Sequence, residues 1–226
     1  ISYDYNGHGT HIAGIIKTVF PSVKILSLKY FNPKASGRDN LKSTIAALKY
    51  AVDVGVDIIN YSGGGPDAST KEMRIIKRAK EKGILIITAA GNEHHNIDQL
   101  SHAYFPASYK FDNILAVTTH DQNNKMLMSS NYGKQTVDIA APGLRIKSSL
   151  PNNRSGYLSG TSQSTAFVTG VAALIMSQFP ELSYFEVKQI IKLSAQKESS
   201  LIGLTSSQGR LDAESAINLA HELFGK

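Results

Sequence analysis

Three residues with chemically useful side chains lie in separate glycine-containing segments of this 226-residue sequence. His8 lies between two glycines at the start of an apolar run, so its ring is accessible and other backbone can approach it. Ser162 enters a long apolar helix from the loop segment Gly160-Thr161, which places its hydroxyl at the positive end of the helix dipole. Asn92 follows an apolar strand, and its amide can donate to a developing oxyanion.

Each of these residues also has an ordinary structural interpretation. A histidine in this context can be a capping or core residue, a serine can cap a helix, and an asparagine can form a turn. A metal site is disfavoured, because His8 and His11 are three residues apart with no glutamate between them and no third ligand. The individual segments therefore leave the chemistry open.

A fourth segment, residues 62–65 (SGGG), ends another apolar strand. Glycines at this position suit the close passage of a peptide backbone.

The elements that would position these residues follow an alternating pattern. Apolar runs predict strands at residues 23–30, 56–61, 84–90, 114–119 and 137–140. Amphipathic or long apolar stretches predict helices at residues 41–54, 70–82, 162–179, 184–195 and 212–224. Continuous apolar strands separated by helices indicate an α/β three-layer sandwich, with a mostly parallel central sheet flanked by helices. No linker or repeat interrupts the pattern, so residues 1–226 are expected to form one domain.

Composition excludes several other classes. The net charge is +6, but the basic residues of the predicted helix 70–82 alternate with glutamates, which is typical of a solvated face and not of a nucleic-acid site. No GxGxxG or P-loop motif follows a strand, which argues against a nucleotide-binding protein. No apolar run reaches the length of ~18 residues that a membrane span needs, and the absence of cysteine excludes disulfides and thiolate metal sites.

Taken in order, the four segments resemble the subtilase (subtilisin-like) family. The matching motifs are HGTHIAG at residues 8–14, SGGG at 62–65, AAGN at 89–92 and GTS at 160–162. The resemblance continues through IAAPG (139–143), IKSSLP (146–151) and GRLDAESAI (209–217), so it covers essentially the whole chain.

The resemblance implies a serine endopeptidase, with His8 as general base and Ser162 as nucleophile. Asn92 would supply the side-chain donor of the oxyanion hole, together with the backbone N–H of Ser162. His11 would be structural.

On the substrate side, the resemblance places a polypeptide against Ser62, Gly63 and Gly64 as an added β-strand. A facing substrate strand is expected near residues 35–39. The S1 pocket would be walled by residues 62–64 and by Ala89, Ala90 and Gly91. Tyr104 lies where many relatives have glycine, which predicts a shallow pocket for small or medium P1 side chains.

The catalytic aspartate of the family is not found in this sequence. It normally lies in a DTG-type block on the first core strand, well before the histidine motif, whereas only seven residues precede His8 here. Asp4 lies outside any such block and is expected to be a surface residue. The domain is therefore expected to be N-terminally incomplete and to lack its first core strand, leaving a slot in the core and unpaired backbone. An N-terminal fragment or segment would supply both the strand and the aspartate.

Other expectations follow from the resemblance. No cofactor is expected, because the family's high-affinity calcium loop is absent near residues 15–22, although a weak calcium site elsewhere stays open. A propeptide inhibitor is a further candidate partner, and the expected location is extracellular. The competing interpretation is a catalytically inactive subtilase-like domain that binds peptides.

Overall fold

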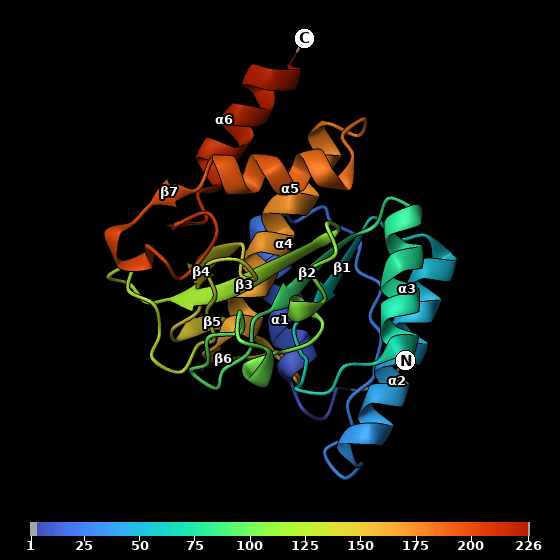
Figure 1. Cartoon of the computed structure of the whole chain (residues 1–226). Coiled ribbons are helices and arrows are strands. Elements are labelled where there is room, and N and C mark those ends of the chain that lie inside the picture. Colours follow the sequence, from blue (N-terminus) through green and yellow to red (C-terminus); the bar gives the residue numbers. More distant parts are fainter. Residues whose placement is uncertain (1–3, 226) are drawn as a thin grey trace.

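Parallel strands form the centre of the molecule (Figure 1), which the computed structural model describes for residues 4–225. The six-stranded sheet has the order β1-β2-β3-β4-β8-β7, and all neighbouring pairs are parallel except β7 with β8. Its strands are β1 (Ile58–Tyr61), β2 (Leu85–Ala89), β3 (Ile114–His120), β4 (Ile139–Pro142), β7 (Gln196–Lys197) and β8 (Gly209–Arg210). A separate antiparallel hairpin consists of β5 (Ile146–Leu150) and β6 (Arg154–Leu158).

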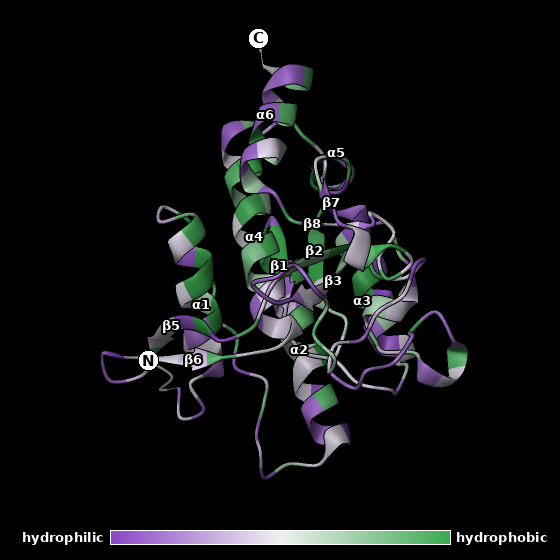
Figure 2. Ribbon diagram, turned by 90° about the vertical axis from the view of Figure 1, so that its left-hand side faces the viewer, coloured by the Kyte–Doolittle hydropathy of each residue, from purple (hydrophilic) through white to green (hydrophobic). Residues whose placement is uncertain are grey.

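Helices cover both faces of this sheet, so the predicted three-layer α/β architecture is confirmed. They are α1 (His8–Val19), α2 (Gly37–Val54), α3 (Thr70–Glu81), α4 (Thr161–Gln178), α5 (Tyr184–Leu193) and α6 (Ala213–Phe224). Leu85 and Ile87 of β2 pack with α4, α5 and α6, while Ile86 between them packs with α2 and α3. Because successive strand residues point to opposite faces, both faces need apolar residues, which explains the continuous apolar runs. Figure 2 shows these residues gathered along α4 and the central strands.

The helix α4 runs through the middle of the molecule. It contacts β1, β2, β3 and β4 as well as α1, α5 and α6. Its buried residues lie on several sides, in contrast to the one-sided pattern of a surface helix. Position and orientation of its N-terminus are therefore set by the whole core.

The predicted strand at residues 23–30 is wrong. This segment has no regular secondary structure and forms no ladder, and Ile25 and Leu26 are 40% and 44% exposed. The strand β1 pairs only with β2, so its other edge has no partner among the described residues. A strand needs a hydrogen-bonded neighbour, and here an open cavity lies where that neighbour would be.

Smaller differences concern neighbouring segments. Residues 35–39 do not form a strand: Ser36 caps α2, which begins at Gly37. The strand predicted at 137–140 is β4 at Ile139–Pro142, and the hairpin of β5 and β6 was not predicted. None of the helices in the described part of the chain is long and apolar enough to cross a membrane.

Candidate active site

The helices α1 and α4 begin at the same end of the molecule and run side by side (Figure 1). Ile12 and Ile16 of α1 pack against Ala166 of α4, and further along Val19 contacts Gly170. His8 is the first residue of α1 and Ser162 the second residue of α4. The packing of the two helices therefore brings both predicted residues to one face.

Ser162 is linked to the end of β1 by two reciprocal hydrogen bonds. Its hydroxyl donates to the carbonyl oxygen of Ser62 over 3.2 Å, and the Ser62 hydroxyl donates to the carbonyl oxygen of Ser162 over 3.0 Å. Within residues 4–225 the Ser162 hydroxyl makes no hydrogen bond to His8, and the backbone N–H of Ser162 makes none at all. An unpaired N–H in the first turn of a helix is available to bind an anion.

Asn92 follows β2 and turns toward the same helix end. Its Oδ1 accepts hydrogen bonds from the backbone N–H of Thr161 (3.0 Å) and from the Thr161 hydroxyl (3.2 Å). Among the described residues nothing accepts a hydrogen bond from its Nδ2. The amide is thus held through its oxygen by Thr161, the residue before Ser162, and within residues 4–225 its two N–H donors have no acceptor. Thr161 was not predicted as a site residue.

His8 lies partly buried at the site, and its ring makes no hydrogen bond to any described residue. Burial lowers its pKa below the usual 6.5, the neighbouring His11 lowers the pKa further, and the carboxylate of Asp4 raises it. A histidine with a lowered pKa is neutral at pH 7 and able to accept a proton. His11, by contrast, anchors α1 on the hairpin: its Nε2 lies 3.0 and 3.2 Å from the carbonyl oxygens of Ile146 and Gly156.

Asp4 is more than the surface residue that the sequence predicts. Its carboxylate accepts hydrogen bonds from the backbone N–H groups of Asn6 (3.0 Å), Gly7 (2.8 Å) and Thr10 (2.9 Å), and from the Thr10 hydroxyl (2.7 Å). Burial opposes ionisation, but these bonds outweigh it and lower the pKa of Asp4. The carboxylate therefore ties the loop before α1 to Thr10 in the first turn of the helix, on either side of His8.

The predicted substrate residues line one side of this site. Ser62, Gly63 and Gly64 leave β1, and Gly65 then exchanges backbone hydrogen bonds of 3.0 and 2.8 Å with Phe105. The side chains of Ala89 and Ala90 are buried in the core, and Gly91 is buried against Asn131, Glu93 and the ring of Tyr104.

Tyr104 fills much of the space between the two glycine segments. A Cβ on Gly64 would overlap its ring, and a Cβ on Gly91 would lie 2.9 Å from it. Burial raises the pKa of its phenol, and the nearby Glu93 raises it further. Another phenol, Tyr30, lies 2.6 Å from where a Cβ of Gly63 would be, and it was not predicted as a site residue.

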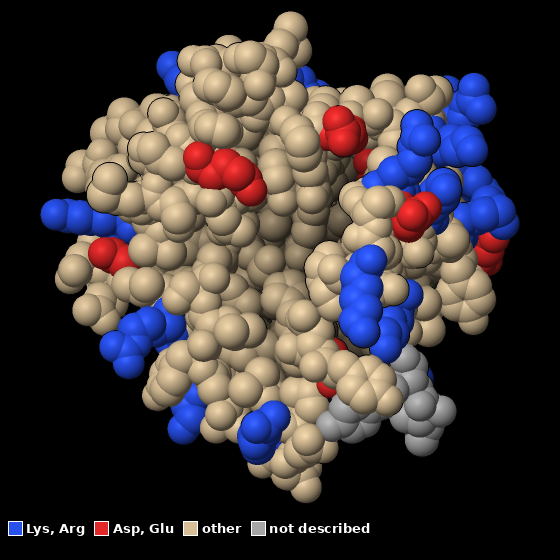
Figure 3. Space-filling model, turned by 90° about the horizontal axis from the view of Figure 1, so that it is seen from below, with Lys and Arg blue, Asp and Glu red and all other residues tan. Residues whose placement is uncertain are grey.

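An open cavity of about 990 Å³ adjoins His8 and Ser62. On one side it is lined by the unpaired edge of β1, and on the other by residues 22–28 and Tyr30. Apolar side chains from α1 and α2 form most of the remaining wall, among them Ile12, Ile16, Leu48 and Ala51. Seen from below, the molecule is hollowed near its middle, and charged side chains lie around the hollow rather than in it (Figure 3). The sequence predicts a slot in the core between two strands, whereas this cavity lies beside β1 at the edge of the described sheet.

No group of three or more histidine, cysteine, aspartate or glutamate side chains in residues 4–225 is arranged to hold a metal ion.

The model of the subtilase family, Peptidase S8, matches residues 1–213. The chain belongs to the subtilase family.

Individual relatives come from bacteria. Subtilisin DY of Bacillus licheniformis is 34% identical over 201 residues, which are 85% of this chain and 71% of the relative. A thermophilic serine proteinase of Bacillus sp. (strain AK1) is 35% identical over 224 residues, covering 95% of this chain but only 53% of the relative. Among solved structures, one described as the structural basis of subtilase cytotoxin SubAB assembly has a TM-score of 0.82 at 28% identity. The match covers 96% of this chain and 77% of the chain in that structure.

Proposed function

We propose that this domain is a serine endopeptidase that hydrolyses peptide bonds through an acyl-enzyme on Ser162. The observation that carries the proposal is a pair of donors near Ser162 that have no acceptor among residues 4–225. These are the Nδ2 of Asn92, whose oxygen is held by Thr161, and the backbone N–H of Ser162 at the start of α4. Two fixed donors next to a nucleophile can stabilise the oxyanion of a tetrahedral intermediate.

In the proposed mechanism His8 accepts the proton of the Ser162 hydroxyl as the oxygen attacks the substrate carbonyl. The carbonyl oxygen becomes an oxyanion and binds to the Nδ2 of Asn92 and the N–H of Ser162. The imidazolium of His8 then protonates the leaving amine, and water hydrolyses the ester in a second, equivalent cycle. The lowered pKa of His8 supports the first step, because the free base is needed.

The cavity beside β1 supports a partner that completes the site. We propose that it receives an extended segment, from the N-terminal side of this domain or from a cleaved fragment, which pairs with β1 and ends in an aspartate near His8. The apolar walls and the free edge of β1 suit a buried strand. A carboxylate on His8 would orient the imidazole, and the Ser162 hydroxyl could then leave Ser62 for His8.

For the substrate we propose a polypeptide bound as an added strand along Ser62–Gly64, with a small or medium P1 side chain. The ring of Tyr104 between Gly64 and Gly91 supports this preference, because it takes up the space that a large side chain would need. Replacement of Tyr104 by glycine should open the pocket and shift the preference of kcat/KM toward phenylalanine at P1. The idea fails if the unaltered protein already cleaves aromatic P1 substrates fastest.

Labelling by a fluorophosphonate probe tests the activity. The protein together with its N-terminal segment should form a covalent adduct on Ser162, detected by intact mass, and residues 1–226 alone should react far more slowly. Ser162→Ala should abolish the adduct. Absence of any adduct in the assembled protein would favour the inactive peptide-binding domain.

Two further points belong to the proposal. We propose that the chemistry needs no cofactor, because the roles above use only side chains and backbone. We also propose that the protein acts outside the cell, which fractionation of the producing cells would test. Activity confined to the cell interior would contradict this location.

A further inference from the structure

The loop that carries Asn92 is held by one buried side chain, that of Asn131. Asn131 lies between β3 and β4 and is 1% exposed. Its Oδ1 accepts hydrogen bonds from the backbone N–H groups of Glu93 (3.1 Å) and His95 (2.9 Å). Its Nδ2 donates to the carbonyl oxygen of Ala90 (2.8 Å) and to the carboxylate of Glu93 (2.6 Å). The amide therefore contacts the chain on both sides of Asn92.

Every polar group of the Asn131 side chain is used, and only one orientation of the amide is compatible with its surroundings. The opposite orientation would set an NH2 group against two backbone N–H donors, and an oxygen against the carbonyl of Ala90 and the carboxylate of Glu93. Among uncharged side chains, an amide of this length supplies two acceptor and two donor sites together. A substitution would leave the buried carbonyl of Ala90 and the partly buried N–H groups of Glu93 and His95 without this partner.

The backbone of the loop is shaped for this contact. Gly91 has a φ of +102°, and a Cβ at this position would overlap the Nδ2 of Asn131. Glycine is thus needed both for the left-handed conformation and for the close approach of the amide.

Asn131 is itself tied to the central sheet. Its N–H donates to the carbonyl oxygen of Gly91 over 2.9 Å, and its carbonyl oxygen accepts from the buried hydroxyl of Thr118 over 2.6 Å. Thr118 lies in the middle of β3 and is 0% exposed. A continuous path of hydrogen bonds therefore leads from the rigid sheet through Asn131 to both neighbours of Asn92.

We infer that Asn131 is a positioning residue of the oxyanion hole. It touches no substrate atom; it fixes the backbone from which Asn92 projects, while Thr161 fixes the amide of Asn92. This inference rests on the proposed peptidase function. Because the donor must meet an oxyanion that exists only in the transition state, a displaced loop should lower kcat much more than it changes KM.

The variant Asn131→Asp tests this role. It keeps the shape and the two acceptor bonds to Glu93 and His95, but replaces the donor by a second carboxylate facing Glu93. We expect kcat for succinyl-Ala-Ala-Pro-Ala-p-nitroanilide to fall roughly 30-fold with KM changed less than about threefold, since displacements near 1 Å cost up to about 100-fold.

Glu93→Gln in the Asn131→Asp background supplies a rescue. The glutamine amide can donate to the new carboxylate, so kcat of the double variant should be at least about fivefold higher than kcat of Asn131→Asp. Glu93→Gln alone should have a kcat close to that of the unaltered protein. Ser130→Ala is the matched control, because the neighbouring Ser130 hydroxyl is buried but has no hydrogen-bond partner among the described residues. If Asn131→Asp does not fold, Asn131→Ser replaces it.

The possible results separate this inference from the proposed function. A loss of kcat with little change in KM, together with rescue by Glu93→Gln, supports the inference. Unchanged kinetics of the folded variant, a loss confined to KM, or no rescue overturns the role of Asn131 while the peptidase function stands. No hydrolysis by the unaltered, assembled protein overturns both.

Discussion

At the scale of single residues, the two ends of the Asn92 amide have different tasks: its oxygen is held by Thr161, and its nitrogen is left to bind a ligand. Thr161 supplies two donors to the amide oxygen, one from its backbone and one from its hydroxyl. A side chain held in this way needs little reorganisation when an oxyanion forms, which is the condition for electrostatic stabilisation of a transition state. The hydroxyl of Thr161 is completely buried, so no water replaces it when it is removed.

Thr161→Val should therefore lower kcat/KM about tenfold, which corresponds to about 1.4 kcal/mol and to one buried hydrogen bond. Valine keeps the shape and the backbone N–H donor and removes only the hydroxyl. Steady-state hydrolysis of a peptide anilide measures the effect. Thr161→Ser restores the donor and should recover most of the rate. Equal rates for serine and valine would show that the hydroxyl does not position Asn92.

Asp4→Asn should move the acid limb of the activity profile to lower pH. The carboxylate of Asp4 raises the pKa of His8, while burial and His11 lower it, so loss of the charge leaves only the lowering contributions. His8 would then lose its proton at a lower pH, and the active free base would persist further into the acid range. The rate of fluorophosphonate labelling measured against pH gives the position of this limb.

Asp39→Asn is the control, because Asp39 is an exposed residue paired with Lys42 at the start of α2 and is not among the charges that shift the pKa of His8. An acid limb that moves to higher pH in Asp4→Asn, or that stays in place, would contradict the assigned electrostatics.

Some of these residues could be predicted from sequence and others could not. His8 and Asn92 stand next to glycines and Ser162 follows Gly160 by two residues, all at the ends of apolar runs, and this local pattern can be read from the sequence. Thr161 stands next to Ser162 in the same motif, but its role depends on Asn92, 69 positions away. Asn131 and Tyr30 act through contacts with distant loops, and nothing in their neighbouring residues indicates them.

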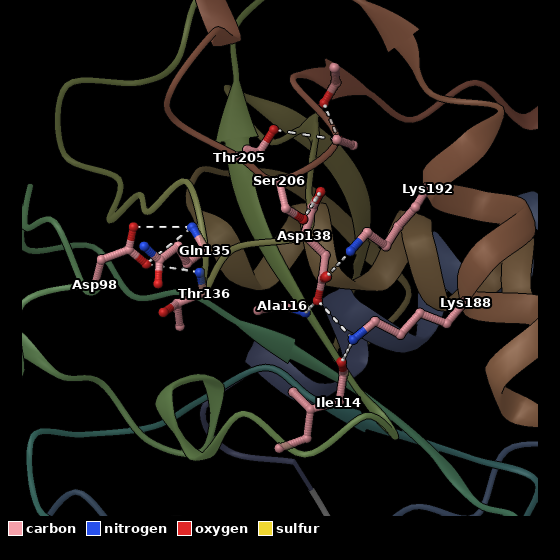
Figure 4. A network of polar contacts seen from close by, with 12 residues as sticks. Asp98, Ile114, Ala116, Gln135, Thr136, Asp138, Lys188, Lys192, Thr205 and Ser206 are labelled. Carbon is pink, nitrogen blue, oxygen red and sulfur yellow. Dashed lines mark hydrogen bonds and ion pairs between the residues drawn. The ribbon is translucent and has the colours of Figure 1, made fainter.

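At the scale of elements, α5 is joined to the amino ends of β3 and β4 by a buried ionic network (Figure 4). The carboxylate of Asp138 pairs with Lys192 at 2.8 Å and Lys188 at 3.3 Å, and it accepts a hydrogen bond from the N–H of Ala116 at 2.9 Å. Lys188 also donates to the carbonyl oxygen of Ile114. This end of the sheet lies opposite the candidate site, so the network concerns stability.

Asp138→Asn should lower the free energy of unfolding by about 3 kcal/mol, because two largely buried ammonium groups lose their counter-charge. Asparagine keeps an acceptor for Ala116, so the loss reports on the charge. Urea unfolding measures it. Lys192→Gln, the control, removes the more exposed ammonium and leaves Asp138 paired with Lys188; it should cost about 1 kcal/mol or less. A change below about 0.5 kcal/mol in Asp138→Asn would mean that the network contributes no net stability.

The helices and most core strands follow from the sequence, because the period of apolar residues depends only on which faces are buried. The start of α2 at Gly37 and the exact bounds of β4 depend on caps and pairing, and were less well predicted. Residues 23–30 are an apolar run that forms no strand. Their composition is typical of a strand, but a ladder also requires a neighbour, and the described chain offers none on that side of β1.

At the scale of the whole molecule, one edge of β1 has no partner strand among residues 4–225 and borders an open cavity. Backbone groups at this edge lose the hydrogen bonds that a neighbouring strand would provide. The apolar side chains at Ile25 and Leu26 stay about two-fifths exposed for the same reason. An extended segment that enters the cavity should therefore act as a ligand of the folded state, with little affinity for the unfolded chain.

A synthetic segment of about ten residues should raise the melting temperature of this domain. The segment consists of β-branched apolar residues, with lysines at its amino end and the sequence Asp-Thr-Gly at its carboxyl end. At a hundredfold excess over its Kd the expected gain is about 2.7 kcal/mol, or roughly 5–10 °C for a domain of this size. A scrambled peptide of the same composition should have no effect.

The same segment with asparagine in place of its aspartate should stabilise the domain equally, because pairing with β1 needs only the backbone. It should leave Ser162 unreactive toward fluorophosphonate, because the orientation of His8 needs the carboxylate. Equal melting temperatures with the designed and scrambled peptides would contradict a strand-binding cavity, and equal labelling with the aspartate and asparagine segments would contradict the role of the carboxylate.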